Sequence, residues 1–307
     1  MYENIQTFSI VFISILLEAF PFIMLGIIIS AIIQELVSDD LIRKIIPRNS
    51  FGGAIIGVLM GFLFPVCDCA VIPVARRLIK KGVPLNVAIT FMLAGPIINP
   101  IVIIATIYSF NSTIPKMFVL RSIIGVLIAV IIGYIMGALA KNTNQLKKSN
   151  TNSDCECCCS EDNHNEHNKN LWQILKGIIH HSRIEFFDIG KYLILGAFVA
   201  ALAQSFIPRE LMLSIGKNPI LSVLAMMIFA YVISLCSTAD SFVAKTFVGQ
   251  FTNSSILAFL LLGPMIDIKN TLVLWGNFKS KFVNRLVCFI FVLCFLSVLI
   301  LNLFIKF

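Results

Sequence analysis

The sequence has few charged residues. Only 13% of its 307 residues are Asp, Glu, Lys or Arg, while 58% are hydrophobic. Soluble domains carry about a quarter charged residues, so too few polar side chains remain here to cover a water-exposed surface. An ordinary soluble enzyme is therefore excluded. The net charge of +8 lies in short basic clusters between apolar runs, which fits cytoplasmic loops and excludes a nucleic-acid-binding face.

The chain also lacks basic residues at its start and any glycine-rich phosphate-binding loop. No Lys or Arg precedes the first apolar run, and this run is too long for the apolar core of a cleaved signal peptide. We therefore expect it to remain as the first membrane span. Without an ATP site in the sequence, transport of a solute would be secondary, although a separate ATPase partner stays open.

Long apolar runs dominate what is present. Crossing the hydrocarbon takes about 20 apolar residues, and lipid offers the backbone no hydrogen-bond partners, so the spans must be helical. The runs cover residues 8–33, 51–75, 85–108, 117–140, 192–207, 219–239, 256–275 and 286–304. Eight is a minimum, and some are expected to be half-helices, because prolines interrupt them at Pro65, Pro73, Pro96, Pro100 and Pro264.

A polar segment divides the chain into two related halves. Residues 141–170 consist largely of Asn, Ser, Lys, Asp and Cys, which predicts a disordered cytoplasmic linker between transmembrane repeats at residues 1–140 and 171–307. Four residues of the first half have counterparts 170 positions later in the second half. The pairs are Glu18 and Asp188, Gly26 and Gly196, Ala31 and Ala201, and Gln34 and Gln204.

This register continues through the conspicuous motifs. Cys67 matches Cys236, and the Gly95-Pro96 pair matches Gly263-Pro264, with a slip of one or two residues. Such a duplication is typical of transporters whose two bundles move against each other around a central site. The alternative is a duplication that only built a stable bundle. The sequence leaves open whether the repeats are parallel or inverted. The expected fold is an all-α polytopic membrane protein with two pseudo-symmetric repeats and broken helices.

The first helix break carries thiols and a carboxylate. Cys67, Asp68 and Cys69 follow an apolar run and lie between two prolines, and the second half places Cys236 and Asp240 at the corresponding point. Irregular backbone within a membrane survives where it lines a cavity, so we expect these residues to bind substrate. The alternative is that the thiols only pack, since Cys is a compact hydrophobe.

The second break gives a further pair of candidates. Unwinding at Gly95-Pro96 and Gly263-Pro264 would free carbonyl groups, and Asn99 and Asp267 could supply oxygen ligands beside them. The alternative is a proline kink with a satisfied polar neighbour.

Two acidic residues are candidates for proton coupling. Glu18 lies well inside the first span and Asp188 is its counterpart in the second half. Carboxylates within the membrane usually mark ion or proton pathways. Alternatively, Glu18 is a structural partner for Arg121 or Lys191, and Asp188 lies in an interfacial stretch.

The linker carries its own set of candidate metal ligands, and these are Cys155, Cys157, Cys158, Cys159, His164 and His167. Thiolate and imidazole ligands suit soft or borderline ions such as Zn(II) and Cu(I). The spacing matches no closed zinc finger, so it predicts a flexible capture or sensing segment. A linker that is rich in Cys by drift is the alternative.

The block PVCDCAVIPVARR at residues 65–77, followed by AGPIINP at residues 94–100, resembles the signature of the predicted permease family typified by YraQ and the organoarsenical exporter ArsP. The family motif usually reads Cys-x-Cys-Gly, and Ala70 stands here in place of the glycine. The resemblance covers both halves but not the linker. It implies an integral cytoplasmic-membrane permease exporting thiol-seeking metal or metalloid species, with Cys67, Cys69 and Cys236 contacting the cargo.

Taken together, these features predict a multi-pass permease of the cell membrane that exports a thiophilic metal or metalloid species, or a small conjugate of one. We expect no catalytic activity and no cofactor, apart from a soft metal ion in the linker. The expected partners are the lipid bilayer and the small solute, while a homo-oligomer or a membrane or periplasmic partner protein stays open. The alternatives are a thiol-disulfide oxidoreductase using Cys67 and Cys69, and a non-transporting subunit of a larger complex.

Overall fold

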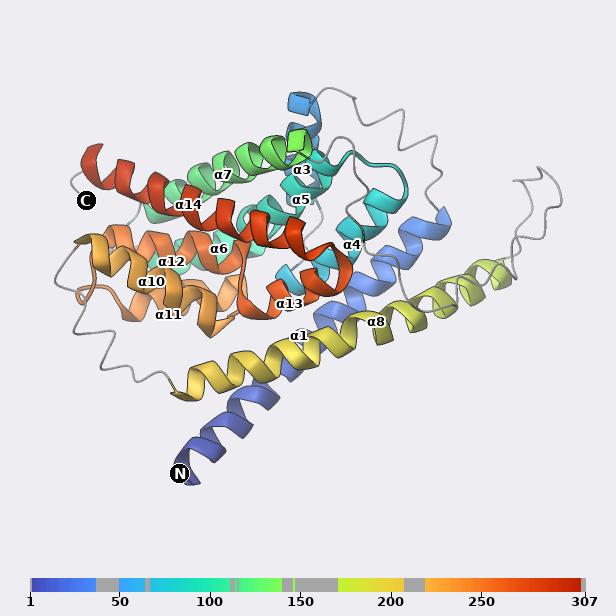
Figure 1. Cartoon of the computed structure of the whole chain (residues 1–307), viewed down its shortest axis with the longest axis horizontal. Coiled ribbons are helices and arrows are strands. Elements are labelled where there is room, and N and C mark those ends of the chain that lie inside the picture. Colours follow the sequence, from blue (N-terminus) through green and yellow to red (C-terminus); the bar gives the residue numbers. More distant parts are fainter. Residues whose placement is uncertain are drawn as a thin grey trace.

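The computed structural model describes residues 2–36, 50–63, 67–110, 114, 116–139, 146, 171–206 and 219–304. Within these ranges the chain forms helices and, apart from two isolated bridges, no β-structure (Figure 1). The prediction of an all-α fold is therefore confirmed. The predicted linker falls almost entirely outside the described residues, so the domain division stays a prediction.

The described helices run in the same order in each half. The first half contains α1 (Tyr2–Leu36), α3 (Ser50–Leu63), α4 (Asp68–Lys80), α5 (Leu85–Ile98), α6 (Pro100–Phe110) and α7 (Met117–Leu139). The second half contains α8 (Leu171–Phe206), α10 (Pro219–Ile233), α11 (Ser237–Thr246), α12 (Asn253–Met265), α13 (Ile268–Asn277) and α14 (Ser280–Phe304).

The apolar helices identify a multi-pass membrane protein. Five stretches are long and apolar enough to cross a bilayer, at Gln6–Ile32, Leu85–Phe110, Met117–Leu139, Asn253–Asn277 and Ser280–Asn302. Three shorter apolar helices lie at Gly52–Leu63, Ile189–Ser205 and Ile220–Ile233. Each of these eight stretches coincides with one of the eight runs expected from the sequence.

Several expected boundaries were wrong. The runs at residues 51–75 and 219–239 are each split into two helices, in agreement with the expected half-helices, whereas the run at 192–207 belongs to a helix that begins at residue 171. Pro73, Pro96 and Pro264 lie inside helices, so they do not mark breaks. Pro100 opens α6, where a missing N–H costs little.

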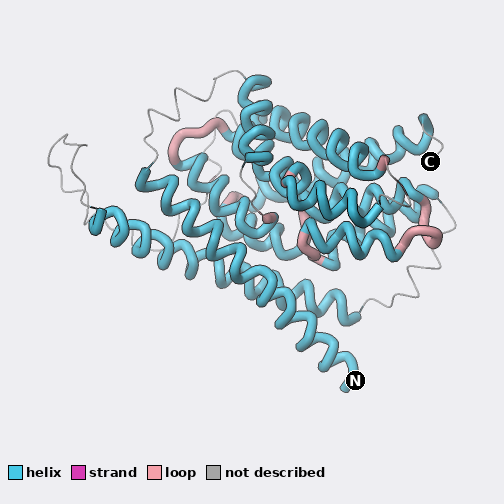
Figure 2. Tube along the Cα trace, turned by 180° about the vertical axis from the view of Figure 1, so that it is seen from behind, coloured by secondary structure: helices cyan, strands magenta, loops and turns pink. Residues whose placement is uncertain are grey.

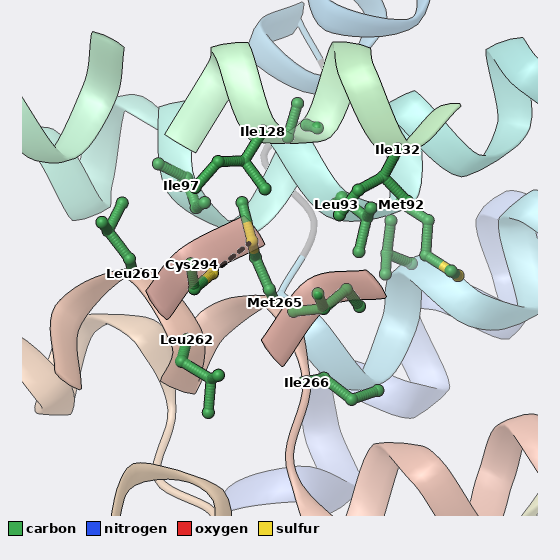
Figure 3. Packing of buried hydrophobic residues seen from close by; sticks show 14 of the residues in the cluster. Met92, Leu93, Ile97, Ile128, Ile132, Leu261, Leu262, Met265, Ile266 and Cys294 are labelled. Carbon is green, nitrogen blue, oxygen red and sulfur yellow. Dashed lines mark hydrogen bonds between the residues drawn. The ribbon is translucent and has the colours of Figure 1, made fainter. Parts of the chain in front are cut away.

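Helices α5 and α12 contact each other at the centre of the molecule. Nearly every residue of both is buried, as expected for helices that are apolar on all sides. Figure 3 shows the core around them, where Met265 of α12 meets Cys294 of α14 with the two sulfur atoms 3.9 Å apart. Cys294 thus packs in the core.

The two halves pack against this centre in matching ways. Helix α3 packs on α5 as α10 packs on α12, and α4 meets α13 of the other half as α11 meets α6. The long helices depart from this symmetry. Helices α1 and α8 pack against each other, with α1 on α4 and α8 on α13. Both therefore lie along the same side of the molecule, as Figures 1 and 2 show.

Two glycines at matching positions permit this close packing. A Cβ atom at Gly26 of α1 would lie 2.5 Å from the Cβ of Ala70, and one at Gly196 of α8 would lie 3.0 Å from the Cα of Lys269. These are residues of α4 and α13, the helices that contribute to the site described next.

Candidate functional site

Helices α4 and α11 begin at matching residues of the two halves. Their N-cap residues, Cys67 and Cys236, have extended backbones and make no side-chain capping hydrogen bond. The sulfur of Cys236 lies 3.2 Å from the hydroxyl oxygen of Thr238 instead. The side chains of Cys67 and Cys236 therefore do not cap the first-turn N–H groups of their helices. These backbone groups add polar surface at each break.

One pocket joins these breaks. It is small, and it is lined by Ile15, Glu18, Ala19, Phe22, Cys67, Asp68, Cys69, Cys236 and Lys269. The three thiols border the same space, although Cys236 comes from the second half. All three are free thiols. Helix α1 forms one wall of the pocket, where it presents the exposed Glu18.

Asp68 is the buried carboxylate of this pocket. Its exposed fraction is 3%, and its Oδ1 atom has no hydrogen-bond partner among the described residues. Ser237, its counterpart in the second half, hydrogen-bonds with it, and Lys269 and Asp267 contribute to its electrostatic surroundings. A buried carboxylate with an unpaired oxygen is costly within a membrane and typically marks a functional position.

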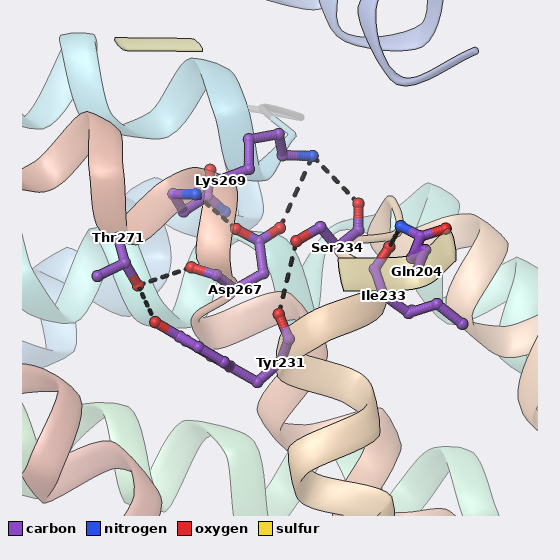
Figure 4. A network of polar contacts seen from close by, with 8 residues as sticks. Gln204, Tyr231, Ile233, Ser234, Asp267, Lys269 and Thr271 are labelled. Atoms are coloured by element: carbon purple, nitrogen blue, oxygen red, sulfur yellow. Dashed lines mark hydrogen bonds and ion pairs between the residues drawn. The ribbon is translucent and has the colours of Figure 1, made fainter. Parts of the chain in front are cut away.

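Lys269 of α13 supplies the positive charge of the pocket. Its Nζ atom lies 3.7 Å from Oδ2 of Asp267 and donates a hydrogen bond of 3.4 Å to the carbonyl oxygen of Ser234 (Figure 4). Ser234 has a φ of +48°, a left-handed conformation that a residue other than glycine adopts at an energetic cost. Behind this network, Tyr231 donates a hydrogen bond of 3.1 Å to Thr271.

Asn99 and Asp267 occupy matching positions as helix caps. Oδ1 of Asp267 accepts a hydrogen bond from the backbone N–H of Asn270 at the start of α13, and Oδ1 of Asn99 accepts one from Ile101 at the start of α6. Neither residue lines the pocket. Each satisfies orphan N–H groups of a broken helix, and Asp267 also pairs with Lys269.

Asp240 lies in a different cluster, around Arg121. This arginine, on α7 of the first half, is 1% exposed and donates hydrogen bonds to the hydroxyls of Thr106 and Ser241 at 2.8 and 2.7 Å. A third bond of 3.2 Å reaches the carbonyl oxygen of Ser237. Asp240 contributes to the electrostatic surroundings of the guanidinium. Arg121 therefore ties α6 and α7 to α11.

The structure thus brings some of the expected site residues together and separates others. Glu18, Cys67, Asp68, Cys69 and Cys236 share the pocket, whereas Asn99, Asp240 and Asp267 do not line it. Among the described residues, no three His, Cys, Asp or Glu side chains are arranged to hold a metal ion. Asp188 lies on α8 but its side chain is not described, and the six metal-ligand candidates of the linker lie outside the described residues.

Two charged residues of this region were not among the expected site residues. Lys269 stands two positions after Asp267 in an otherwise apolar stretch, so an isolated cation inside a span was the available signal. Arg121 was considered only as a partner for Glu18, and its hydrogen bonds go to Thr106, Ser241 and Ser237 instead.

Comparison with known proteins gives a consistent result. The profile of a family described as predicted permease matches residues 4–303. UPF0718 protein YcgR of Bacillus subtilis is 42% identical over 283 residues, which cover 92% of each chain. A Streptococcus mutans protein, named as a candidate subunit of a two-component membrane permease complex, is 37% identical over 90% of this chain and 89% of its own. UPF0718 protein YraQ of Escherichia coli is 29% identical over 25% of this chain and 22% of its own. No solved structure matches significantly.

Proposed function

This chain belongs to the predicted permease family, and on that premise we propose that it is a secondary transporter that exports a thiophilic, cationic metal or metalloid species or a small conjugate of one. Cys67, Cys69 and Cys236 would contact the soft centre of the cargo, and Asp68 would supply an oxygen contact and a negative charge. The meeting of these thiols from both halves in one pocket is the observation that carries the proposal.

The choice of a soft cargo follows from the donor atoms. Thiols bind soft and borderline ions in preference to hard ones such as Mg²⁺ or Ca²⁺. The thiols do not form a ready-made metal cluster, and loose coordination suits a carrier, because a cargo that is held too tightly is not released.

The choice of a positive cargo follows from the balance of charge. Glu18, Asp68 and Lys269 line the pocket, and Asp267 lies against Lys269. Three carboxyl groups therefore face one ammonium group. A cation that entered would improve this balance, whereas an anion would worsen it. Glu18 remains the proposed proton-coupling group, because it lies on the pocket wall and carboxylates within a membrane usually mark ion or proton pathways.

Transport of candidate ions tests the proposal. Purified protein in liposomes would be assayed for movement of Zn²⁺, Cd²⁺ and Cu⁺, and cells with and without the gene would be compared for accumulation of the same ions. We expect one of them to move. The Cys69→Ser variant should lose most of this movement, while the matched control Cys288→Ser, at an exposed thiol on α14, should retain it. Equal transport by both variants would reject a role for the pocket thiols.

A second candidate is that the chain acts as one subunit of a larger permease complex. The name of the Streptococcus mutans relative favours it. In that case the chain alone would move nothing in liposomes, and co-expression with a membrane partner would restore transport that still depends on Cys69. A thiol-disulfide oxidoreductase would instead show Cys67 and Cys69 cycling between dithiol and disulfide during turnover, which thiol titration after oxidant treatment would detect.

A further inference from the structure

Lys269 is a buried cation that has no charged counterpart at the matching position of the first half. It is 4% exposed, whereas Ile101, the residue at the matching position in the first half, is 58% exposed and apolar. Both residues lie two positions after a helix-capping side chain, Asp267 or Asn99. Since the same helix start forms without a cation in the first half, the lysine serves the pocket rather than the fold of α13.

The contacts of Lys269 are long for a buried ammonium group. Its Nζ atom lies 3.7 Å from Oδ2 of Asp267 and 3.4 Å from the carbonyl oxygen of Ser234, beyond the distances of about 2.7–2.9 Å that are typical of charge-assisted hydrogen bonds. It also hydrogen-bonds with the thiol of Cys69. An ammonium group has three donors, and its four-carbon stem is flexible. Lys269 is therefore held in place by the surrounding charge more than by fixed hydrogen bonds.

The carboxylates around Lys269 are also incompletely satisfied. Oδ1 of Asp68 and Oδ2 of Asp267 are buried without a hydrogen-bond partner among the described residues. Asp68, Asp267, Cys69 and Glu18 all contribute to the electrostatic surroundings of the lysine. One loosely held ammonium group thus balances the same carboxylates and thiol that would receive a cationic cargo.

We propose that Lys269 is a tethered counter-cation that competes with the cargo for Asp68 and Cys69. In the empty pocket its ammonium group balances Asp68 and Cys69 as well as its partners Asp267 and Ser234. An arriving cation takes over Asp68 and Cys69, while the lysine keeps Asp267 and the carbonyl oxygen of Ser234. The lysine lowers the affinity for the cargo, regains Asp68 and Cys69 when the cargo leaves, and so keeps a thiol-lined pocket from trapping its ion. This inference rests on the proposed function, because it requires a cationic, thiophilic cargo.

Cadmium binding to the full-length protein in detergent tests the competition. All variants would carry Ser in place of the four linker cysteines, so that absorption from cadmium–thiolate bonds reports the pocket, and calorimetry would give the dissociation constant. Competition predicts that Lys269→Met binds Cd²⁺ at least tenfold more tightly than the parent protein. The matched control Lys269→Arg, which keeps the charge, should stay within about threefold of the parent.

The possible outcomes separate the competition from the proposed function. A purely structural lysine would leave affinity unchanged or weaken it in Lys269→Met, and either result would overturn the inference while leaving the thiol site in place. A lack of cadmium–thiolate absorption in the parent and in Lys269→Met alike would overturn both proposals. Should Lys269→Met not fold, the Asp267→Asn/Lys269→Met protein would be compared with Asp267→Asn alone, and the same tenfold gain is expected.

Discussion

The α4/α13 side and the α6/α11 side of the molecule are built from matching helices but carry opposite kinds of polar site. On the first side, Asp68 and Cys69 border an open pocket opposite Lys269. On the second side, their counterparts Ser237 and Thr238 begin α11, and Arg121 fills the space with hydrogen bonds to neighbouring helices. The long helices α1 and α8 both cover the pocket side.

This difference shows that the two matching sides of a duplicated fold differ in their role, one stabilising the molecule and the other forming a pocket. A broken helix leaves polar backbone groups that must be satisfied wherever it occurs. On the α6/α11 side a buried arginine donates to the carbonyl oxygen of Ser237 and to two hydroxyls, and so ties the two halves together. Among the described residues, Oδ2 of Asp240 lacks a hydrogen-bond partner there, as do Oδ1 of Asp68 and Oδ2 of Asp267 on the α4/α13 side. Of these three carboxylates, Asp68 alone borders the pocket. The α6/α11 arrangement suits stability, and the α4/α13 arrangement leaves the pocket open to a ligand.

If the α6/α11 side is structural, Arg121→Met should cause the largest loss of stability. The substitution removes three hydrogen bonds of a buried charged group, each worth about 1.5–3 kcal/mol, and takes a cation from the electrostatic surroundings of the buried Asp240. The melting temperature of the purified protein in detergent would measure this. Arg121→Lys, which keeps the charge but not the geometry, should lose less. A melting temperature equal to that of the parent in Arg121→Met would remove the contrast between the two sides.

A smaller effect is expected where the long helices approach the pocket side. Adding a methyl group at Gly26 forces it to within 2.5 Å of the Ala70 side chain, and overpacking of this kind costs about 1–3 kcal/mol. Gly26→Ala should therefore lower the melting temperature and disturb the α1 wall of the pocket, with Gly196→Ala having a milder effect. Gly190→Ala is the control, because a Cβ there meets nothing within 4 Å. Equal melting temperatures for Gly26→Ala and Gly190→Ala would contradict the close approach of α1 to α4.

The smallest effect should come from the network behind Lys269. Tyr231→Phe removes the hydrogen bond from Tyr231 to Thr271, which is worth about 0.5–1.5 kcal/mol. Stability should fall by this modest amount, because the pocket side depends less on its polar contacts than the Arg121 cluster does. Tyr108→Phe, at a tyrosine that is 79% exposed, should change nothing. A loss from Tyr231→Phe as large as that from Arg121→Met would show that the pocket side is equally structural.

The membrane spans and the pairing of the halves could be predicted from the sequence. Apolar length alone located the eight apolar stretches of the described residues, though not their ends, because lipid imposes a simple requirement on composition. The shared spacing that paired Cys67 with Cys236 also anticipated that these residues begin matching helices. Proline was less informative, since Pro73, Pro96 and Pro264 lie within helices and the breaks fall at Cys67, Asn99, Cys236 and Asp267 instead.

The charged partners could not be predicted. Arg121 meets Ser241 across 120 positions of sequence, and a hydropathy profile does not show which distant hydroxyls a lone arginine will reach. The roles of Asn99 and Asp267 were also ambiguous, because a helix cap and an oxygen ligand require the same side chains. Only the packing of α13 against α4 placed Lys269, and not Asn99, beside the thiols.

The packing of α1 makes the two walls of the pocket mechanically unequal. In the central window of α1 28% of the residues are buried, against 89% in the stretch formed by α12 and α13. Moving α1 would break its packing on α8 and α4, whereas moving α13 would disrupt the middle of the molecule. The α13 wall of the pocket is therefore the more firmly held of the two, because it belongs to the buried core.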